Sequence, residues 1–272
     1  MRKLFESVLP FFLGAPGLLW QILFFYLPLV CIFIMSSGSF SYFYPFLNSL
    51  YARVILRSLL LAGATTGITL CMAYPTAYFL AFFAQRLKTF LLFLIILPFC
   101  TNFLLHVIAW FFVLEQHGLI NTFLLNLHII NSPLQLLNNV FAVILMMVYY
   151  YLPFMVLPIY AVLEKFDYKV IEASLDLGAT WYQTLARVVI PLTIPGIQAG
   201  MFLVFVPAFG EFAIPELMGG DTMMFVGTVV SYYILGSRTA HLGASFTLIS
   251  VVVLIISMCT LYGITEWIRG KR

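Results

Sequence analysis

The chain has very little charge. Only 8% of its 272 residues are Asp, Glu, Lys or Arg, whereas a typical soluble domain has about 25%. Hydrophobic residues make up 63%, and the mean hydropathy is +1.08. These values exclude an ordinary soluble domain. The sequence also lacks the pattern Gly-x-x-x-x-Gly-Lys-Ser/Thr, whose backbone amides hold nucleotide phosphates. We therefore expect no enzyme activity of its own, and any ATP-driven work must use the ATPase of another chain.

Groupings of metal-binding residues are missing as well. The four cysteines stand in separate apolar stretches without the paired spacing of a zinc or redox motif, and the four histidines are scattered. They are Cys31, Cys71, Cys100 and Cys259, and His106, His117, His128 and His241. We expect neither a metal nor a cofactor. No low-complexity linker divides the chain, so a single membrane domain over residues 1–272 is predicted.

Long apolar runs are what the chain has instead. A membrane helix needs about 20 mostly apolar residues. Six stretches reach that length, at about 9–35, 54–84, 90–114, 139–163, 193–217 and 241–266. We predict an all-α membrane protein with six transmembrane helices. The first run follows Arg2 and Lys3 as a signal peptide would, but it is too long and lacks a small-residue cleavage site.

The basic residues predict the orientation of the helices. Of the 13 lysines and arginines, all except Arg53, Arg57 and Arg238 fall in the connections of one side of the membrane. Because cytoplasmic loops carry the excess of Lys and Arg, both termini are expected in the cytoplasm. The largest cytoplasmic connection is then the loop at about 164–192.

The residues of this loop predict two short helices joined by a turn. Asp167 can cap a first helix, and Gly178 can end it in the left-handed conformation. Thr180 and Gln183 have the spacing of a capping box. Pro191 is expected to end the second helix. The loop should be a rigid helix-turn-helix.

The same loop is more apolar than a free cytoplasmic segment needs to be. Two explanations are open on the residues alone: a hairpin that lies on lipid headgroups or under its own helices, and a docking surface for a cytoplasmic partner. The apolar residues are Val170, Ile171, Leu175, Trp181, Leu185, Val188 and Val189.

The stretch EASLDLGATWYQTLARVVIPL resembles the EAA loop of permease subunits in ABC importers. The family pattern is Glu-Ala-Ala, then Gly four residues after the second Ala, then an apolar residue and Pro near the end. Ser174 replaces the second Ala, one small residue for another. The resemblance implies a type I importer fold in which the first helix of the loop sits in a groove of an ATP-binding subunit. The expected coupling residues are Glu172, Ala173, Ser174, Asp176, Gly178 and Pro191.

The fifth apolar run is interrupted in the stretch FVPAFGEFAIPELMGGD. Pro207, Gly210 and Pro215 predict unwound backbone, which is tolerated at membrane depth only where it is buried in protein or lines a cavity. Glu211 stands in the middle of this break. A carboxylate at membrane depth indicates a functional site by default; a structural ion pair, or a position in the outer interface, is the alternative.

Aromatic residues form a second candidate feature. Tyr149, Tyr150 and Tyr151 are consecutive, and successive helical residues point about 100° apart, so at least one should face the bundle interior. Trp110 fits an aromatic belt at the membrane interface, or else the solute path. Tyrosine rings beside a carboxylate suit an organic ammonium ion. The expected substrate-path residues are Glu211, Tyr150, Tyr151 and Trp110.

A second resemblance covers roughly residues 55–265. The stretches LLFLIILPFCTNFLLHVIAW, YYLPFMVLPIYAVLEKFDYKVIEASLDLGA and FVPAFGEFAIPELMGG resemble the spermidine/putrescine importer permeases. This implies a polyamine permease of the bacterial inner membrane. Its partners would be two copies of a cytoplasmic ATP-binding subunit, a second permease subunit, an extracytoplasmic polyamine-binding protein and membrane lipid, with no nucleic acid. Sister families carry iron, thiamine, phosphonates and sugars on the same scaffold, so another small solute stays open.

Two other classes of membrane protein fit the sequence less well. A membrane protease would use Ser245, but the Gly-rich surroundings of such a nucleophile are missing and His241 lies only four residues away. A secondary transporter driven by an ion gradient usually has broken helices in both of two inverted halves, whereas only the fifth run here is clearly broken. Arg53 and Arg57 share one helix face at the outer side and suit solvent, lipid phosphate or an external binding protein.

Overall fold

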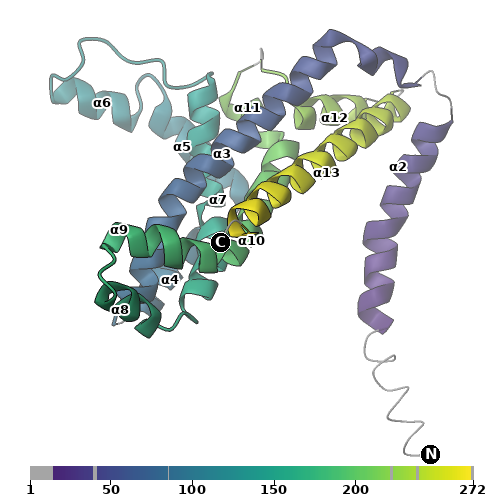
Figure 1. Ribbon diagram of the computed structural model, residues 1–272. Coiled ribbons are helices and arrows are strands. Elements are labelled where there is room, and N and C mark those ends of the chain that lie inside the picture. Colours follow the sequence, from purple (N-terminus) through teal and green to yellow (C-terminus); the bar gives the residue numbers. More distant parts are fainter. Residues whose placement is uncertain (1–14, 39–41, 85, 221–222, 237–238, 271–272) are drawn as a thin grey trace, which may run out of the picture. The chain divides into compact units, whose positions relative to one another are not determined.

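The computed structural model describes residues 15–38, 42–84, 86–220, 223–236 and 239–270, the side chains of residues 268 and 269 excepted. Within these ranges all regular secondary structure is helical, and there is no strand (Figure 1). The predicted all-α membrane class is confirmed. The six helices long and apolar enough to cross a membrane are Ala15–Ser37, Ser49–Phe82, Phe103–Asn126, Val140–Leu163, Trp181–Gly210 and Ala240–Trp267.

Several residues used in the sequence analysis lie outside the described ranges. They are the start of the first apolar run at residues 9–14, Asp221 at the end of the interrupted stretch, and five of the basic residues that predict the orientation, namely Arg2, Lys3, Arg238, Lys271 and Arg272. The cytoplasmic position of the termini therefore stays a prediction.

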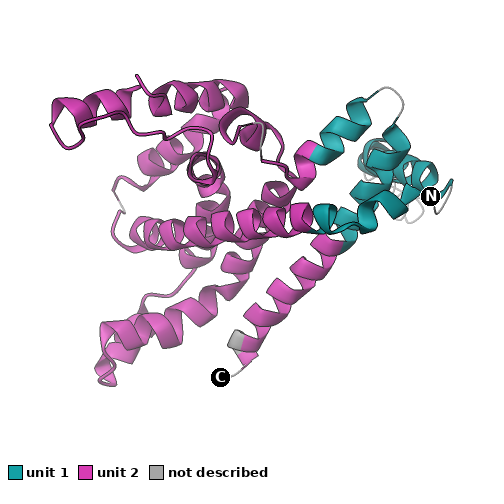
Figure 2. Cartoon of the chain, turned by 90° about the horizontal axis from the view of Figure 1, so that it is seen from above, with its two compact units in different colours: residues 1–52, 229–252 teal, residues 53–228, 253–272 magenta. Residues whose placement is uncertain are grey.

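The chain divides into two compact units (Figure 2). Unit one comprises residues 1–52 and 229–252, and unit two comprises residues 53–228 and 253–272. The single membrane domain of the sequence analysis stays a prediction. Unit one contains the π-helical turn η1 (Ile22–Tyr26), α2 (Leu27–Ser37), the 3-10 turn η3 (Tyr44–Leu47), most of α12 (Val226–Leu235) and the first part of α13 (Ala240–Gly270).

Unit one has an aromatic core. The buried ring of Phe46 lies 5.1 Å from that of Phe246 and 4.8 Å from that of Tyr51, centroid to centroid. The hydroxyls of Tyr51 and Tyr233 are 2.7 Å apart. Aromatic pairs at such distances add stabilisation beyond the area they bury, so these rings help to hold the elements of unit one together.

Unit two contains most of the helices and both candidate sites. Its elements are α3 (Ser49–Phe82) from residue 53 onward, α4 (Lys88–Ile96), η4 (Leu97–Cys100), α5 (Phe103–Leu114), α6 (Leu119–Asn126), α7 (Val140–Leu163), α8 (Lys169–Asp176), α9 (Trp181–Thr184), η5 (Leu185–Val189), α10 (Ile190–Gly210), α11 (Ala213–Met218) and the end of α13.

The third predicted span was wrong in its bounds. A single helix was expected at about 90–114, but the helix turns into a 3-10 turn at Leu97 and stops before α5. Pro98 lies in that turn and cannot donate a backbone hydrogen bond. The side chain of Asn102 then accepts a hydrogen bond of 2.8 Å from the backbone N–H of Leu104 and starts α5 afresh. The candidate span is consequently Phe103–Asn126.

The core of unit two is the contact between α7 and α10, which lie side by side in Figure 1. Gly196 and Gly200 of α10 are four residues apart and face α7. A Cβ atom on Gly196 would lie 2.8 Å from the carbonyl oxygen of Pro158, and one on Gly200 would lie 2.7 Å from the sulfur of Met155. Small residues at this spacing let two membrane helices approach closely, so the two glycines set the α7–α10 distance.

Pro191 does not end the second helix of the hairpin, contrary to the prediction. Helical structure runs without interruption from Trp181 to Gly210. The π-helical turn η5 directly precedes α10, the helix that contains Pro191. In this turn the N–H of Ile190 bonds to the carbonyl of Leu185. A π turn shifts the local hydrogen-bond pattern, so the missing N–H of proline and its clash with the preceding turn are accommodated. The hairpin is therefore continuous with the fifth span.

Candidate functional site

The predicted break in the fifth span is present. Helix α10 ends at Gly210, Glu211 is extended with ψ of 132°, and α11 starts at Ala213. The break is local in origin, because Pro207 and Gly210 precede it and neither supports a regular helix interior.

Glu211 is held by hydrogen bonds from both sides of the break. Its Oε1 accepts from the backbone N–H groups of Phe212 and Ala213 at 3.1 and 3.0 Å. Its Oε2 accepts from the hydroxyl of Tyr151 on α7 at 2.9 Å. The side chain is half-buried. Glu211 thus satisfies backbone donors freed by the break and ties α7 to it.

The carboxylate keeps unused acceptor capacity. An ionised carboxylate has about four lone-pair sites, and three hydrogen bonds occupy three of them. Within the described residues no lysine, arginine or histidine forms an ion pair with Glu211. The alternative of a structural ion pair at this position has no support among these residues. The arrangement can attract a cation without first giving up a partner.

The three consecutive tyrosines take three different positions. Tyr151 is buried and bonds to Glu211, as expected for a residue facing the interior. Tyr150 is half-buried, with its ring centroid 5.4 Å from that of Tyr151 and 4.8 Å from that of Phe103. Tyr149 points elsewhere and donates or accepts a 3.0 Å hydrogen bond with Nδ1 of His106. Tyr150 and Tyr151 are therefore brought to the break together.

Trp110 is not brought to the carboxylate by any described contact. Its ring lies 5.4 Å from that of Tyr149, on the side of α7 that faces α5. Two residues that were not predicted to belong here are His106, which bonds to Tyr149, and Phe103, which packs on Tyr150. Their position at i, i+3 and i+7 with Trp110, on one face of α5, was the pattern that pointed to them.

A glycine of α12 packs directly against the break. A Cβ atom on Gly227 would lie 2.4 Å from the carbonyl oxygen of Gly210 and 2.5 Å from that of Glu211. Real Cβ atoms do not approach backbone that closely, so only glycine fits here without a shift. The backbone around Glu211 is enclosed as well as hydrogen-bonded.

Between Asp167 and Gln183 the hairpin has the local structure that the sequence predicts. The side chain of Asp167 accepts a hydrogen bond from the N–H of Lys169 at the start of α8. Gly178 has φ of +84°, the left-handed region that ends a helix. Both hydrogen bonds of the capping box between Thr180 and Gln183 are present. The angle between α8 and α9 is thus set by local interactions.

Ser174 does more than replace one small residue by another. Its hydroxyl lies 3.0 Å from that of Thr184, which is buried. An alanine at this position cannot make that bond. The residue that departs from the family pattern therefore links α8 to α9.

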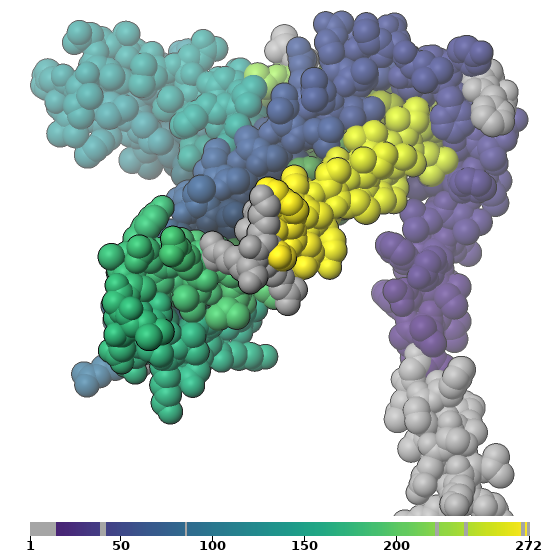
Figure 3. All heavy atoms as spheres, in the orientation of Figure 1, coloured from purple at the N-terminus to yellow at the C-terminus, as the bar shows by residue number. Residues whose placement is uncertain are grey.

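The hairpin turns part of its apolar face inward and leaves part exposed. Ile171 and Val189 are buried, and the ring of Trp181 lies 6.5 Å from that of Tyr78 on α3. Leu177 and Tyr182 are 88% and 73% exposed. The atoms of the hairpin form a continuous green surface on the face drawn in Figure 3. Packing under its own helices accounts for the buried part only.

The expected coupling residues lie along this surface. Glu172, Ala173, Asp176 and Gly178 are exposed, and no described side chain bonds to either carboxylate. Pro191 is only half-exposed and lies in the continuous helix beyond η5. The first four are placed where a second chain can reach them.

An ion pair lies beside the hairpin at the end of α7. The ammonium of Lys88 bonds to the carboxylate of Glu164. This bond lowers the pKa of Glu164 from its ordinary value and raises the pKa of Lys88 to about 12. Both groups are exposed enough to be screened by solvent, so the pair is a small contribution to stability.

Ser245 does not have the surroundings of a nucleophile. It is buried in unit one, donates to the carbonyl of His241 and accepts from the hydroxyl of Ser36 at 3.2 Å. The ring of His241 packs on Tyr42 at 4.4 Å instead. This geometry does not support the protease alternative.

The sequence is similar to that of known transport proteins. Residues 73–268 match the family described as "Binding-protein-dependent transport system inner membrane component". The chain is 36% identical over 264 residues to the spermidine/putrescine transport system permease protein PotB of Haemophilus influenzae, covering 93% of this chain and 92% of that one. It is 37% identical over 247 residues to PotB of Escherichia coli K12, covering 86% and 90%.

A solved structure shares the fold. One chain of a bacterial ABC transporter involved in the import of the acidic polysaccharide alginate superposes with a TM-score of 0.78, covering 97% of this chain and 98% of that one. The sequence identity is 15%, so this likeness concerns the fold alone.

Proposed function

This chain belongs to the family of binding-protein-dependent transport system inner membrane components and has the type I ABC importer permease fold, and from this we propose that it passes a polyamine, putrescine or spermidine, through the inner membrane. The names of the relatives from Haemophilus influenzae and Escherichia coli support this solute. The fold does not indicate which solute is carried, since the matching solved chain is part of an importer of an acidic polysaccharide.

The observation that carries the proposal is the half-buried carboxylate of Glu211 with two tyrosine rings beside it. A polyamine presents ammonium groups separated by short methylene chains. An ammonium can pair with the free acceptor site of Glu211 and lie against the ring of Tyr150, through charge and cation–π attraction. Desolvation at membrane depth strengthens both interactions relative to water. Trp110 is kept as a weaker candidate of the same path.

The partners of the chain follow from the same proposal. The exposed surface of α8, with Glu172, Ala173 and Asp176, binds a cytoplasmic ATP-binding subunit. Two copies of that subunit bind the two permeases of the importer. Ser174 and Gly178 fix the shape of the α8 surface from within. The family description supports an external binding protein, which would deliver the polyamine. Both termini would face the cytoplasm.

A continuous helix offers a mechanical path between the two sites. The segment Trp181–Gly210 has 30 residues, about 45 Å at roughly 1.5 Å per residue. It starts at the hairpin and ends at the break that holds Glu211. When ATP closes the ATP-binding subunits, displacement of the hairpin would move the end of α10 directly. Alternating access would then reposition Glu211 between the two sides of the membrane.

Uptake of labelled putrescine and spermidine tests the function. Cells without this chain should lose ATP-dependent uptake, and the wild-type chain should restore it. Unlabelled polyamine should compete, whereas thiamine, a phosphonate and iron should not. Competition by one of those solutes would assign another cargo. Transport by the purified chain alone under an ion gradient would replace the importer with a secondary transporter.

A further inference from the structure

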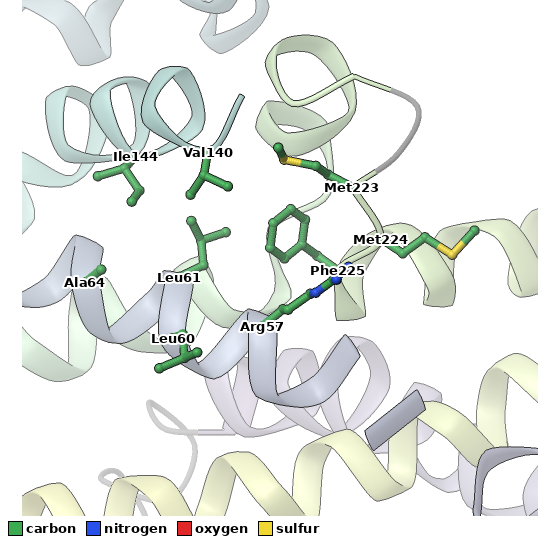
Figure 4. Close-up of a pocket in the computed structure, with 9 residues that line it drawn as sticks. All are labelled: Arg57, Leu60, Leu61, Ala64, Val140, Ile144, Met223, Met224 and Phe225. Carbon is green, nitrogen blue, oxygen red and sulfur yellow. The ribbon is translucent and has the colours of Figure 1, made fainter. Parts of the chain in front are cut away.

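Unit two contains a cavity that the proposed solute path does not use. It has a volume of about 560 Å³ and lies between the first turns of α7 and the outer third of α3. That volume is within the range of about 300 to 1,000 Å³ that holds small ligands. Its lining is apolar with one exception, Arg57; the apolar residues are Leu60, Leu61, Ala64, Val140, Ile144, Met223, Met224 and Phe225 (Figure 4).

A hydrogen bond next to the cavity joins two of the segments that form its walls. The hydroxyl of Ser58, one residue beyond Arg57, accepts a 2.8 Å bond from the backbone N–H of Val226. Ser58 and Phe225 are buried. Figure 4 shows the side chains of Leu61, Val140 and Phe225 pointing toward one another. The cavity is therefore a built feature of unit two.

Arg57 is a cation without a partner at the edge of this cavity. Its side chain is exposed, and within the described residues no hydrogen bond or ion pair joins it to another group. It lies inside a candidate membrane span. An unpaired guanidinium is unfavourable in hydrocarbon, and such side chains extend toward the headgroup region.

The length of α3 places Arg57 at headgroup level. The helix has 34 residues, about 51 Å at roughly 1.5 Å per residue, whereas the hydrocarbon core is about 30 Å thick. One or both of its ends must therefore extend beyond the core. The charged residues of α3, Arg53 and Arg57, both lie in its first turns, so it is this end that we place in the headgroup region. Leu60, Leu61 and Ala64 follow one to two turns deeper. The cavity thus has its charge at the polar end and its apolar lining toward the hydrocarbon.

We propose that this cavity binds one phospholipid, with the phosphate on Arg57 and an acyl chain along the apolar walls of α3 and α7. A guanidinium forms bidentate, charge-assisted hydrogen bonds with phosphate oxygens. A polyamine does not fit, because Arg57 would repel it. Free phosphate would leave the apolar walls unoccupied.

Photolabelling tests the site in the assembled complex. The complex is purified with its partner subunits and placed in vesicles of digalactosyldiacylglycerol, which contains no phosphate. Traces of phosphatidylglycerol with a diazirine in its acyl chain are added, and labelled peptides are mapped. Label is expected on Leu60, Ile144 or Met224. Diacylglycerol with the same diazirine should label these residues weakly.

Variants separate the charge from the cavity. Arg57→Gln should lower phosphatidylglycerol labelling about tenfold, and Arg57→Lys should recover most of it, which excludes misfolding. Ala64→Phe fills the cavity and should lower labelling as strongly. Ala109→Phe makes the same change on an exposed position of α5 and should leave labelling unchanged.

Three outcomes would overturn the proposal. The first is equal labelling of wild type and Arg57→Gln. The second is displacement of the label by excess spermidine, which would make the cavity part of the solute path. The third is labelling that occurs only after the second permease is removed, which would mean that a protein covers the cavity. None of the measurements depends on transport.

Discussion

The hairpin and the break are two interruptions of helix in unit two. Their acidic residues differ in exposure and in hydrogen bonding. In the hairpin, Glu172 and Asp176 are exposed and bond to no described side chain, beside apolar residues such as Leu177. In the break, Glu211 is half-buried and accepts three hydrogen bonds. The first arrangement leaves both carboxylates available to another chain, as we propose. The second is complete in itself apart from one acceptor site, which suits a passing solute.

The glycines of the hairpin and of the break differ in how much space surrounds them. Gly178 has a positive φ and nothing within 4 Å of a Cβ atom built on it, so its surroundings are open. Gly227 has its would-be Cβ 2.4 Å from backbone, so its surroundings are closed. The hairpin is shaped by local conformation, and the break by packing.

Reversal of charge at Glu172 should have the largest effect. Glu172→Arg replaces an anion with a cation at the proposed interface with the ATP-binding subunit. Such a charge mismatch costs several kcal/mol. Polyamine uptake should fall about 100-fold or more, and the ATP-binding subunit should no longer co-purify. Abundance in the membrane should not change. Glu115→Arg, also at an exposed carboxylate, should retain the subunit; normal uptake by Glu172→Arg would rule out docking here.

Neutralisation of Glu211 should give the complementary result. Glu211→Gln keeps the shape and the acceptor for the two backbone N–H groups but removes the charge. Loss of a charged hydrogen bond of about 1.5–3 kcal/mol predicts a rise of about 10- to 100-fold in the KM for polyamine. Co-purification of the ATP-binding subunit should be unchanged. Glu216→Gln, at an exposed residue of α11, serves as the control, and an unaltered KM for Glu211→Gln would remove Glu211 from the path.

Substitution of alanine for Gly227 and for Gly178 compares the stability of the break with that of the hairpin. Gly227→Ala forces a methyl group against the backbone of the break, and overpacking of this kind costs about 1–3 kcal/mol. Gly178→Ala strains a left-handed residue by about 1–2 kcal/mol. Thermal unfolding in detergent should show a larger loss for Gly227→Ala, and only this variant should also raise the KM. The reverse order of stability would contradict the packing around Glu211.

Removal of one hydroxyl should have a smaller effect. Tyr151→Phe keeps the ring but deletes the donor to Oε2 of Glu211, a hydrogen bond worth about 0.5–1.5 kcal/mol. The KM should rise about 2- to 12-fold. Tyr149→Phe, whose hydroxyl bonds to His106, is the matched control. Equal effects of the two variants would mean that Tyr151 has no special relation to the carboxylate.

The Lys88–Glu164 pair should give the smallest effect. The pKa of Glu164 is lower in the folded chain than its ordinary value of 4.5. The pair therefore stabilises the fold above about pH 4.5, and this contribution is lost as the pH falls through the lowered pKa. Glu164→Gln should leave uptake at pH 7 nearly unchanged. Its unfolding temperature should differ from that of the wild type at pH 7 but converge with it under strong acid.

Prediction from sequence succeeded for features that a few neighbouring residues determine. Gly178 and the capping box of Thr180 and Gln183 act over three to four residues, and each is present as expected. The break at Glu211 likewise follows from Pro207 and Gly210. Where the expectation failed, at Pro191 and in the third span, the local rule was overridden by a π turn or by a cap that restarted the helix.

The sequence by itself determined that this is a helical membrane protein with a helix-turn-helix hairpin and one broken span, because hydropathy, proline, glycine and capping residues act locally. Only the tertiary structure decided that Tyr151 and not Tyr149 meets Glu211, that Ser174 bonds to Thr184, and that Gly227 closes the break. These contacts join residues on different helices. They depend on how each helix is rotated about its axis, which packing between helices sets and no single helix encodes.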